Sequence, residues 1–261
     1  MMRAIYTATT GMLGQQLNID TISNNIANVN TTAYKKQRTE FNDLFYQTLQ
    51  HAGTATSENT ISPTGMAVGL GVSPGGINKL FSQGSLKETE NNLDLAITGK
   101  GFFEIQLPNG QTAYTRSGNF KLDDNGNIVT SEGYLLNPQI TIPQDAVQFN
   151  IGSDGTVSSV QADGQSQVIG QIQIASFTNP TGLHPLGNNL YQATNASGAA
   201  FVGIATENGL GSIKQGFLEL SNVRLVEEMT DLITGQRAYE ANSKSIQTAD
   251  SMLQIINGLK R

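Results

Sequence analysis

The sequence predicts an α+β protein: N- and C-terminal helices pair as a coiled-coil stem, and an all-β domain of short antiparallel strands and hairpins is inserted between them. Two observations support this prediction. Apolar residues recur at intervals of seven near both ends of the 261-residue chain, which is the spacing of helices that wind around each other. The middle of the chain alternates short apolar runs with Gly, Asn and Pro, which is typical of strands joined by tight turns.

The C-terminal helix is predicted over residues 221–261, where residues 222–257 form the longest periodic stretch without proline. Two rows of residues run along this helix as its edges, and each residue of the second edge comes three positions after one of the first. One edge is apolar throughout: Leu225, Leu232, Tyr239, Ile246 and Leu253. The other is polar or small at first and apolar only toward its end: Glu228, Gly235, Asn242, Ala249 and Ile256. A helix with such an apolar edge needs a partner helix.

The partner is predicted at the N-terminus, within a helical arm at residues 1–45. Glycines and asparagines weaken its first helix, which should end between Asn28 and Thr32 because short polar side chains compete for the backbone there. The spacing of Phe41, Leu44, Phe45 and Leu49 predicts a second short helix. We expect apolar residues of both helices to form an assembly interface: Ile5, Met12, Ile19, Ile22, Ile26, Val29, Leu225, Leu232, Tyr239, Ile246, Ala249, Leu253 and Ile256.

Between the helices we expect two further segments. Residues 46–76 are rich in glycine and contain two prolines, which predicts an extended loop or hairpin. A compact protein seldom keeps so long a loop without a use for it. Residues 77–220 form the β-rich domain, with hairpins at Pro108-Asn109-Gly110 and at 124–127 and room for a subdomain at 140–170.

Composition excludes several classes of protein. The net charge is −6, without a basic stripe interleaved with aromatic residues, so neither a nucleic acid nor an anionic membrane surface is an expected partner. The chain has no cysteine, which removes disulfides and thiolate chemistry. No signal peptide pattern or membrane-length apolar run is present, so we expect no membrane insertion and no cleaved signal.

Candidate chemical sites all have simpler explanations, and we predict no catalytic residue, cofactor or metal. Asp123, Asn125 and Asn127 have the spacing of calcium ligands, but the glycine is misplaced, so a type I′ turn is predicted. Gly99-Lys100-Gly101 runs into a strand, which predicts a glycine bend and no phosphate site. The two histidines, His51 and His184, are far apart in sequence and are expected in solvent.

Several stretches of sequence resemble a known family. The run LNIDTISNNIANVNTTAYKK at 17–36 is similar to the N-terminal signature of bacterial flagellar rod and hook proteins, and residues 91–105, 113–136, 171–198 and 211–257 resemble later parts of that family. The signature residues are Ser23, Asn24, Asn25, Ala27, Asn28 and Asn30. The length, and the segment from Tyr46 to Val72, are similar to the distal rod members. The family usually has Gly-Phe where this chain has Ala33-Tyr34, so we expect Asn30 or Thr31 to carry any turn with positive φ.

The resemblance implies a structural, non-enzymatic subunit of the flagellar basal body. It implies export by the flagellar type III apparatus, helical polymerisation into the rigid periplasmic distal rod and transmission of motor torque to the hook. Implied partners are further copies of the chain, other rod and hook subunits, and the surrounding periplasmic and outer-membrane rings. We expect the helices inside the polymer and the β-rich domain outside.

We add two hypotheses, one about folding of the terminal helices and one about the 46–72 segment. The terminal helices should be largely disordered in the free monomer and fold when subunits pack together. The 46–72 segment should lock the polymer straight, which imaging of a polymer without the segment would test.

A proximal rod or hook subunit is the alternative within the family. A cell-wall hydrolase would need a carboxylate pair flanking a sugar cleft, and pairs such as Glu88 and Glu90 or Asp123 and Asp124 are not accompanied by one in the sequence. An adhesin would bind as a monomer and have no use for matched sevenfold spacing at both ends.

Overall fold

The computed structural model describes residues 2–53, 55–57, 60–61, 63–143, 146–161 and 165–258. The chain divides into two compact units. The helix unit contains Met1–Ala27, Gln37–Asn78 and Arg224–Arg261, and the β unit contains Asn28–Lys36 and Lys79–Val223. Two helices and many short antiparallel strands confirm the predicted α+β class.

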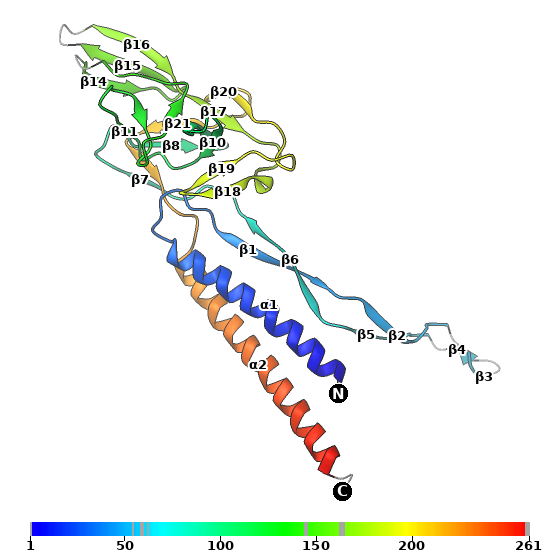
Figure 1. Cartoon of the computed structure of the whole chain (residues 1–261). Helices are drawn as coiled ribbons and strands as arrows, with labels where there is room; N and C mark the ends of the chain where they lie inside the picture. Colours follow the sequence, from blue (N-terminus) through cyan, green and yellow to red (C-terminus); the bar gives the residue numbers. More distant parts are fainter. Residues whose placement is uncertain are drawn as a thin grey trace. The chain divides into compact units, whose positions relative to one another are not determined.

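The helix unit contains two long helices that lie side by side and run in opposite directions (Figure 1). Helix α1 covers Met2–Ala27 and helix α2 covers Leu225–Gly258. The end of α1 immediately precedes the predicted Asn28–Thr32 turn. Within its described residues, neither helix has the length and hydropathy needed to cross a membrane.

The predicted second helix at Phe41–Leu49 is wrong, so the N-terminal arm is helical only to Ala27. Those residues form strands β1 (Gln37–Asp43) and β2 (Tyr46–Gln50). β1 pairs with β6 (Val72–Lys79), and β2 pairs antiparallel with β5 (Met66–Gly69). Strands β3 (Ala55–Ser57) and β4 (Thr60–Ile61) pair further along the same hairpin. A spacing of three and four residues is weak evidence for a helix over so short a run. The hydrogen bonds that β1 and β2 form with later strands favour extended backbone.

Nine strands of the β unit form its main sheet. The order is β11-β12-β13-β9-β10-β19-β18, and β17 pairs with both β9 and β20. The strands are β9 (Phe102–Gln106), β10 (Thr112–Thr115), β11 (Lys121–Leu122), β12 (Ile128–Val129), β13 (Leu135–Asn137), β17 (Gln173–Ser176), β18 (His184–Gly187), β19 (Leu190–Gln192) and β20 (Phe201–Ile204). A 3-10 turn at Pro180–Gly182 precedes β18. The predicted hairpins on either side of Pro108-Asn109-Gly110 and of 124–127 are confirmed.

Smaller sheets complete the β unit. β14 (Ala146–Ile151), β15 (Thr156–Gln161) and β16 (Ser166–Gln171) form a three-stranded antiparallel sheet. β8 (Leu95–Thr98) pairs with β21 (Ser212–Gln215), and β7 (Leu86–Glu88) pairs with β22 (Phe217–Glu219). Both of these pairs join segments that are far apart in the sequence.

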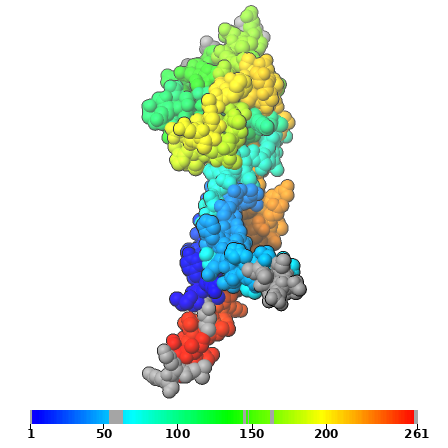
Figure 2. All heavy atoms as spheres, turned by 90° about the vertical axis from the view of Figure 1, so that its right-hand side faces the viewer, coloured from blue at the N-terminus to red at the C-terminus, as the bar shows by residue number. Residues whose placement is uncertain are grey.

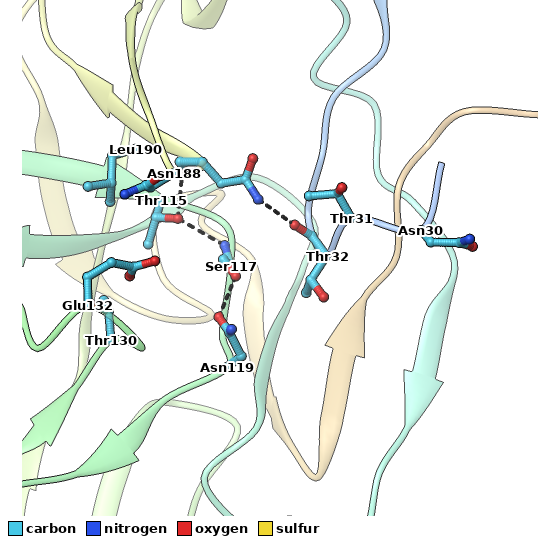
Figure 3. Close-up of a pocket in the computed structure, with 11 residues that line it drawn as sticks. Asn30, Thr31, Thr32, Thr115, Ser117, Asn119, Thr130, Glu132, Asn188 and Leu190 are labelled. Carbon is cyan, nitrogen blue, oxygen red and sulfur yellow. Dashed lines mark hydrogen bonds between the residues drawn. The ribbon is translucent and has the colours of Figure 1, made fainter. Parts of the chain in front are cut away.

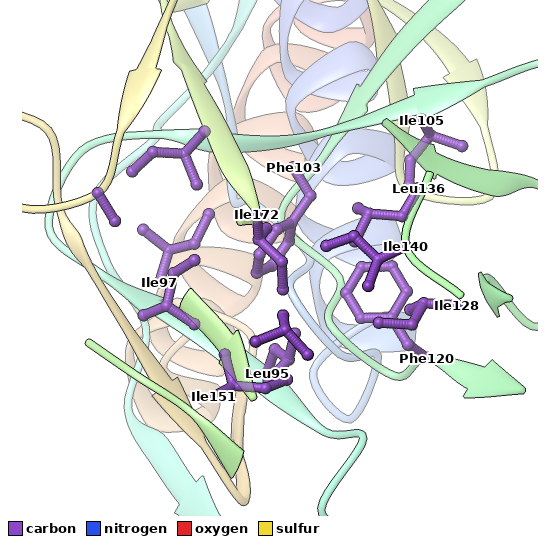
Figure 4. Close-up of a cluster of buried hydrophobic side chains, with 14 of the residues drawn as sticks. Leu95, Ile97, Phe103, Ile105, Phe120, Ile128, Leu136, Ile140, Ile151 and Ile172 are labelled. Atoms are coloured by element: carbon purple, nitrogen blue, oxygen red, sulfur yellow. The ribbon is translucent and has the colours of Figure 1, made fainter. Parts of the chain in front are cut away.

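Strand β9 separates two hydrophobic clusters because successive side chains point to opposite faces of a strand. Phe103 and Ile105 lie in the larger cluster, part of which Figure 4 shows, together with Ile97, Ile172 and others. Phe102 faces a second cluster that contains Phe177 and Tyr191. Both faces of β9 are therefore covered, which explains why its sequence Phe-Phe-Glu-Ile does not alternate between apolar and exposed residues.

The turn at Asp123–Asn127 differs from the predicted type. Gly126 has φ of +79°, but Asp124 and Asn125 keep negative φ. The N–H of Gly126 donates to the carbonyl of Asp123 over 2.8 Å. The loop is therefore a type I turn followed by a left-handed glycine, not a type I′ turn. Asn127 is buried and accepts hydrogen bonds from Gln139 and Thr141, so its side chain has a structural role.

The expectation that Asn30 or Thr31 carries the positive φ after the first helix is wrong. Ala33 itself has φ of +57°, whereas Asn30 and Thr31 keep negative φ. The left-handed conformation costs a non-glycine residue about 1–2 kcal/mol. Its surroundings hold Ala33 in place, because it is 1% exposed and its N–H donates to the carbonyl of Glu219 over 2.8 Å.

Candidate assembly surfaces

Small and polar residues, spaced by seven, form the line along which α1 and α2 meet. On α2, Glu228, Gly235 and Ala249 are the buried residues of the helix. The register is antiparallel: a Cβ added to Gly11 would lie 2.9 Å from Nδ2 of Asn242, and one added to Gly235 would lie 3.3 Å from Cγ1 of Ile19. The two glycines therefore let the helix backbones approach closely. We call this the contact line: Ala4, Gly11, Asn18 and Asn25 of α1 with Glu228, Gly235, Asn242 and Ala249 of α2.

Asn25 joins three elements at one end of the contact line. The residue is 1% exposed. It accepts a hydrogen bond from the N–H of Gln37 (2.9 Å) and donates to the carbonyl of Gln37 (2.8 Å), as a neighbouring strand would. It also donates to Oε2 of Glu228 over 3.0 Å. One signature asparagine thus connects α1 to β1 and to α2, and a bond between the hydroxyls of Thr39 and Thr21 (3.0 Å) reinforces the α1–β1 contact.

Most apolar residues of the predicted assembly interface flank the contact line and are not covered fully within one chain. Ile22 and Ala249 are buried. Tyr239 is 39% exposed and Leu225 is 44% exposed, with Ile256 also exposed. The others are half-buried: Ile5, Met12, Ile19, Ile26, Leu232, Ile246 and Leu253 in the helix unit, and Val29 in the β unit.

Large apolar side chains also project from the outer faces of the two helices. They are Met2, Tyr6, Leu13, Val226, Met229, Ile233 and Ile255. Because Ala4 lies opposite Ala249, the last turns of α2 extend past the start of α1, as the red and dark blue ends show in Figure 2. Exposed apolar side chains that gather on one surface are typical of protein interaction sites.

Hydroxyl groups on these helices are satisfied within their own helix. Each of several Ser and Thr hydroxyls donates to the carbonyl four residues earlier: Thr7, Thr9, Thr230, Thr234, Ser245, Thr248 and Ser251. A neighbour can cover such a surface without leaving these hydroxyls unbonded, which would cost about 1–3 kcal/mol each. The helix faces can therefore pack against a neighbouring molecule without water between them.

The remaining signature residues lie at and beyond the end of α1. Ser23, Asn24 and Ala27 are exposed on the helix. In the β unit, Asn28 accepts a hydrogen bond from the hydroxyl of Thr31 (3.1 Å). The exposed Asn30 lines a polar pocket of 350 Å³ together with Thr32, Ser117 and Glu132 (Figure 3). In the part of the chain that the structure describes, no group of three or more His, Cys, Asp or Glu side chains is placed to hold a metal ion.

A buried ion triad anchors the start of the β unit. Nζ of Lys35 lies 2.6 Å from Oε1 of Glu219, and Nε of Arg116 lies 2.8 Å from Oε2 of the same carboxylate. The side chains of Lys35 and Glu219 are fully buried, and that of Arg116 is 4% exposed. Lys35 and Arg116 also donate to backbone carbonyls, and the N–H of Gly84 donates to Glu219. Sequence reasoning missed this triad because its members are 81 or more residues apart (116 − 35 = 81), and no local spacing links one to another.

The triad keeps the carboxylate ionised. Burial by itself would raise the pKa of Glu219, but the charges of Arg116 and Lys35, with hydrogen bonds from Lys35 and the N–H of Gly84, hold that pKa below its usual value. The connector at residues 28–36 is thereby tied to strand β22 by a charged contact.

Comparison with known proteins gives a consistent family assignment. Three family models match: "Flagella basal body rod protein" over residues 5–35, "Flagellar hook protein FlgE/F/G D1 domain" over 96–159 and "Flagellar basal body rod FlgEFG protein C-terminal" over 214–259. The flagellar basal-body rod protein FlgG of Caulobacter vibrioides is 52% identical over 99% of this chain and all of its own length. FlgG of Borreliella burgdorferi is 49% identical over the whole of both chains, and FlgG of Bacillus subtilis is 45% identical over the whole of both.

A match at this level over the full length shows the family, and both terminal helices and the β unit fall within it. The chain therefore belongs to the FlgG family of flagellar basal-body rod proteins.

Proposed function

We propose that the helix unit is the surface through which copies of this chain pack in the rod. As a member of its family, the chain is a structural subunit of the distal rod, and helical polymerisation, torque transmission and motility follow from that role. The observation that supports the proposed surface is the uncovered apolar residues on the outer faces of α1 and α2.

The two helices act as a coiled-coil stem in this proposal. The contact line brings α1 and α2 close together, while the flanking apolar residues, Ile5, Met12, Ile19, Ile246 and Leu253 among them, are completed by helices of neighbouring subunits. The helical regions of 1–45 and 221–261 would form the axial core, and the β-rich region of 77–220 would lie outside it. Close packing of helices gives such a core its rigidity.

The proposal extends to the wider assembly. Expected partners are further copies of this chain, other rod and hook subunits and the surrounding rings, after export by the type III apparatus. The relatives are rod proteins by name, and we assign this chain a structural role and no catalysis. The 46–72 segment, whose β2 strand is exposed throughout, is proposed to hold the polymer straight.

Charged substitutions at the flanking apolar residues test the proposed surface. Ile246→Asp and Leu253→Asp should each reduce the yield of polymer at least tenfold, because a buried unpaired carboxylate costs several kcal/mol. Gln247→Asp and Gln254→Asp are matched controls on the adjacent, exposed residues and should polymerise normally. Sedimentation and electron microscopy of the full-length chain give the yield. Normal polymers from both the Ile246 and Leu253 variants would contradict the proposed surface.

A further inference from the structure

We infer that the Phe45–Tyr46 pair of one copy inserts into a groove between α1 and α2 of the adjacent copy in the polymer. This inference rests on the proposed function, since it needs subunits that stand side by side.

The inserted half is an exposed aromatic pair at the junction of β1 and β2. Phe45 is 88% exposed and Tyr46 is 60% exposed. The backbone around them is held, because the N–H of Leu70 donates to the carbonyl of Phe45 over 3.2 Å and the N–H of Leu44 donates to that of Gly71 over 2.9 Å. The aromatic rings are therefore presented to solvent from paired strands, not from a free loop.

The receiving half is a groove of 370 Å³ in the helix unit. It is lined by Ala4 of α1 and by Lys244, Ser245, Thr248, Ala249 and Met252 of α2. Small side chains leave the space, and Met252 adds a flexible thioether that packs favourably against aromatic rings. The hydroxyls of Ser245 and Thr248 already donate to backbone carbonyls, so an apolar ring can cover them without leaving them unbonded.

The aromatic pair and the groove lie at the same level along α1. Nη1 of Arg3 donates to Oε1 of Gln47 over 3.0 Å, which places the start of β2 at the level of the first turn of α1. The groove is at the same level, because Ala4 lines it. Copies arranged side by side around a tube would therefore present the aromatic pair of one subunit at the height of the groove of the next.

The charges are also complementary. Asp43, whose carboxylate accepts a hydrogen bond from the hydroxyl of Tyr46, accompanies the aromatic pair, and Lys244 lies at the groove. Opposite charges on the two surfaces favour this pairing and its register over other contacts. A second copy of this chain is thus the occupant that the observations support.

Disulfide cross-linking tests the contact cleanly because the chain has no cysteine. Phe45→Cys chains are mixed with Thr248→Cys chains, polymerised and oxidised. The matched control replaces Thr248→Cys with Thr234→Cys, which has the same residue type and intrahelical bond but lies 14 residues away (248 − 234 = 14), about 21 Å along the helix. We expect at least tenfold more cross-linked dimer with Thr248→Cys than with Thr234→Cys, and none in unpolymerised mixtures.

The outcomes separate this contact from the proposed function. Polymers that form without a Phe45–Thr248 cross-link, or with equal cross-linking at Thr234, overturn the contact and leave the proposed function standing. Failure of the unmodified chain to polymerise overturns both.

A charge exchange gives independent evidence should the cysteine variants assemble poorly. Asp43→Lys should slow polymerisation about tenfold, a change of roughly 1.4 kcal/mol in barrier, and adding Lys244→Asp to the same chain should restore the rate. No recovery in the double variant would count against the contact.

Discussion

Replacing Glu219 with alanine is expected to lower the free energy of unfolding of the β unit by about 3–5 kcal/mol. The substitution leaves the charges of Lys35 and Arg116 buried without their shared counter-ion, and removing one partner of a buried ion pair has a cost of this size. The transition of the β unit in calorimetry of the full-length chain, or in urea unfolding followed by tyrosine fluorescence, measures the change.

Two controls make the expectation specific to the triad. Glu207→Ala removes an exposed carboxylate of the β unit and should change stability by less than about 0.5 kcal/mol. A triple variant with apolar residues at 35, 116 and 219 should recover much of the loss, because no buried charge remains unpaired. A Glu219→Ala chain as stable as the Glu207→Ala chain would show that the triad does not hold the connector.

The same carboxylate gives a dependence on pH with a definite sign. The folded-state pKa of Glu219 lies below its unfolded value, so its contribution is complete above the unfolded pKa and is lost as the pH falls through the folded pKa. The melting temperature of the unmodified chain should therefore fall more steeply on acidification below about pH 4.3, the unfolded value, than that of Glu219→Gln.

Replacing Gly235 with leucine is expected to separate the two helices and abolish polymerisation. A Cβ at this position already lies 3.3 Å from Cγ1 of Ile19, so the rest of a leucine side chain can be placed only by displacing α1. Overpacking of this kind costs about 1–3 kcal/mol in each subunit, and the loss is repeated at every subunit of a polymer. Sedimentation of full-length chains should give a yield at background.

Thr234→Leu is the matched control because it adds the same side chain to the adjacent, exposed residue. This variant should leave the contact line intact, and circular dichroism of the two variants should differ in helical signal under polymerising conditions. Polymerisation of Gly235→Leu at the level of the unmodified chain would mean that α1 and α2 do not need to approach closely.

The sequence predicted the two helices and the hairpins because their signals are local. Sevenfold spacing without proline indicated α2, and turn residues between apolar runs indicated β9 with β10 and β11 with β12. The prediction of a helix at 41–49 was wrong because four apolar residues fit either a helix or a strand. The segment is extended because its strands pair with β5 and β6, which come later in the sequence. The left-handed Ala33 likewise depends on a hydrogen bond to Glu219, far along the chain.

The candidate surface was predictable only in part. Apolar spacing identified residues such as Ile246 and Leu253, but the buried line between the helices consists of Gly11, Gly235, Asn242 and other small or polar residues. These residues also recur at intervals of seven, and that spacing is the sequence signal from which the buried line could have been predicted. The partners of Asn25 and the ion triad could not be predicted, because each joins elements that only the folded chain brings together.

The central claim is that the helix pair is completed by its neighbours, and amide hydrogen exchange of the full-length chain tests it most directly. In dilute monomer, the amides of α1 and α2 should exchange at least about a hundredfold faster than those of β9 and β17, and in the polymer they should become equally protected. Helix amides that are already as protected in the monomer as those of β9 would contradict the claim.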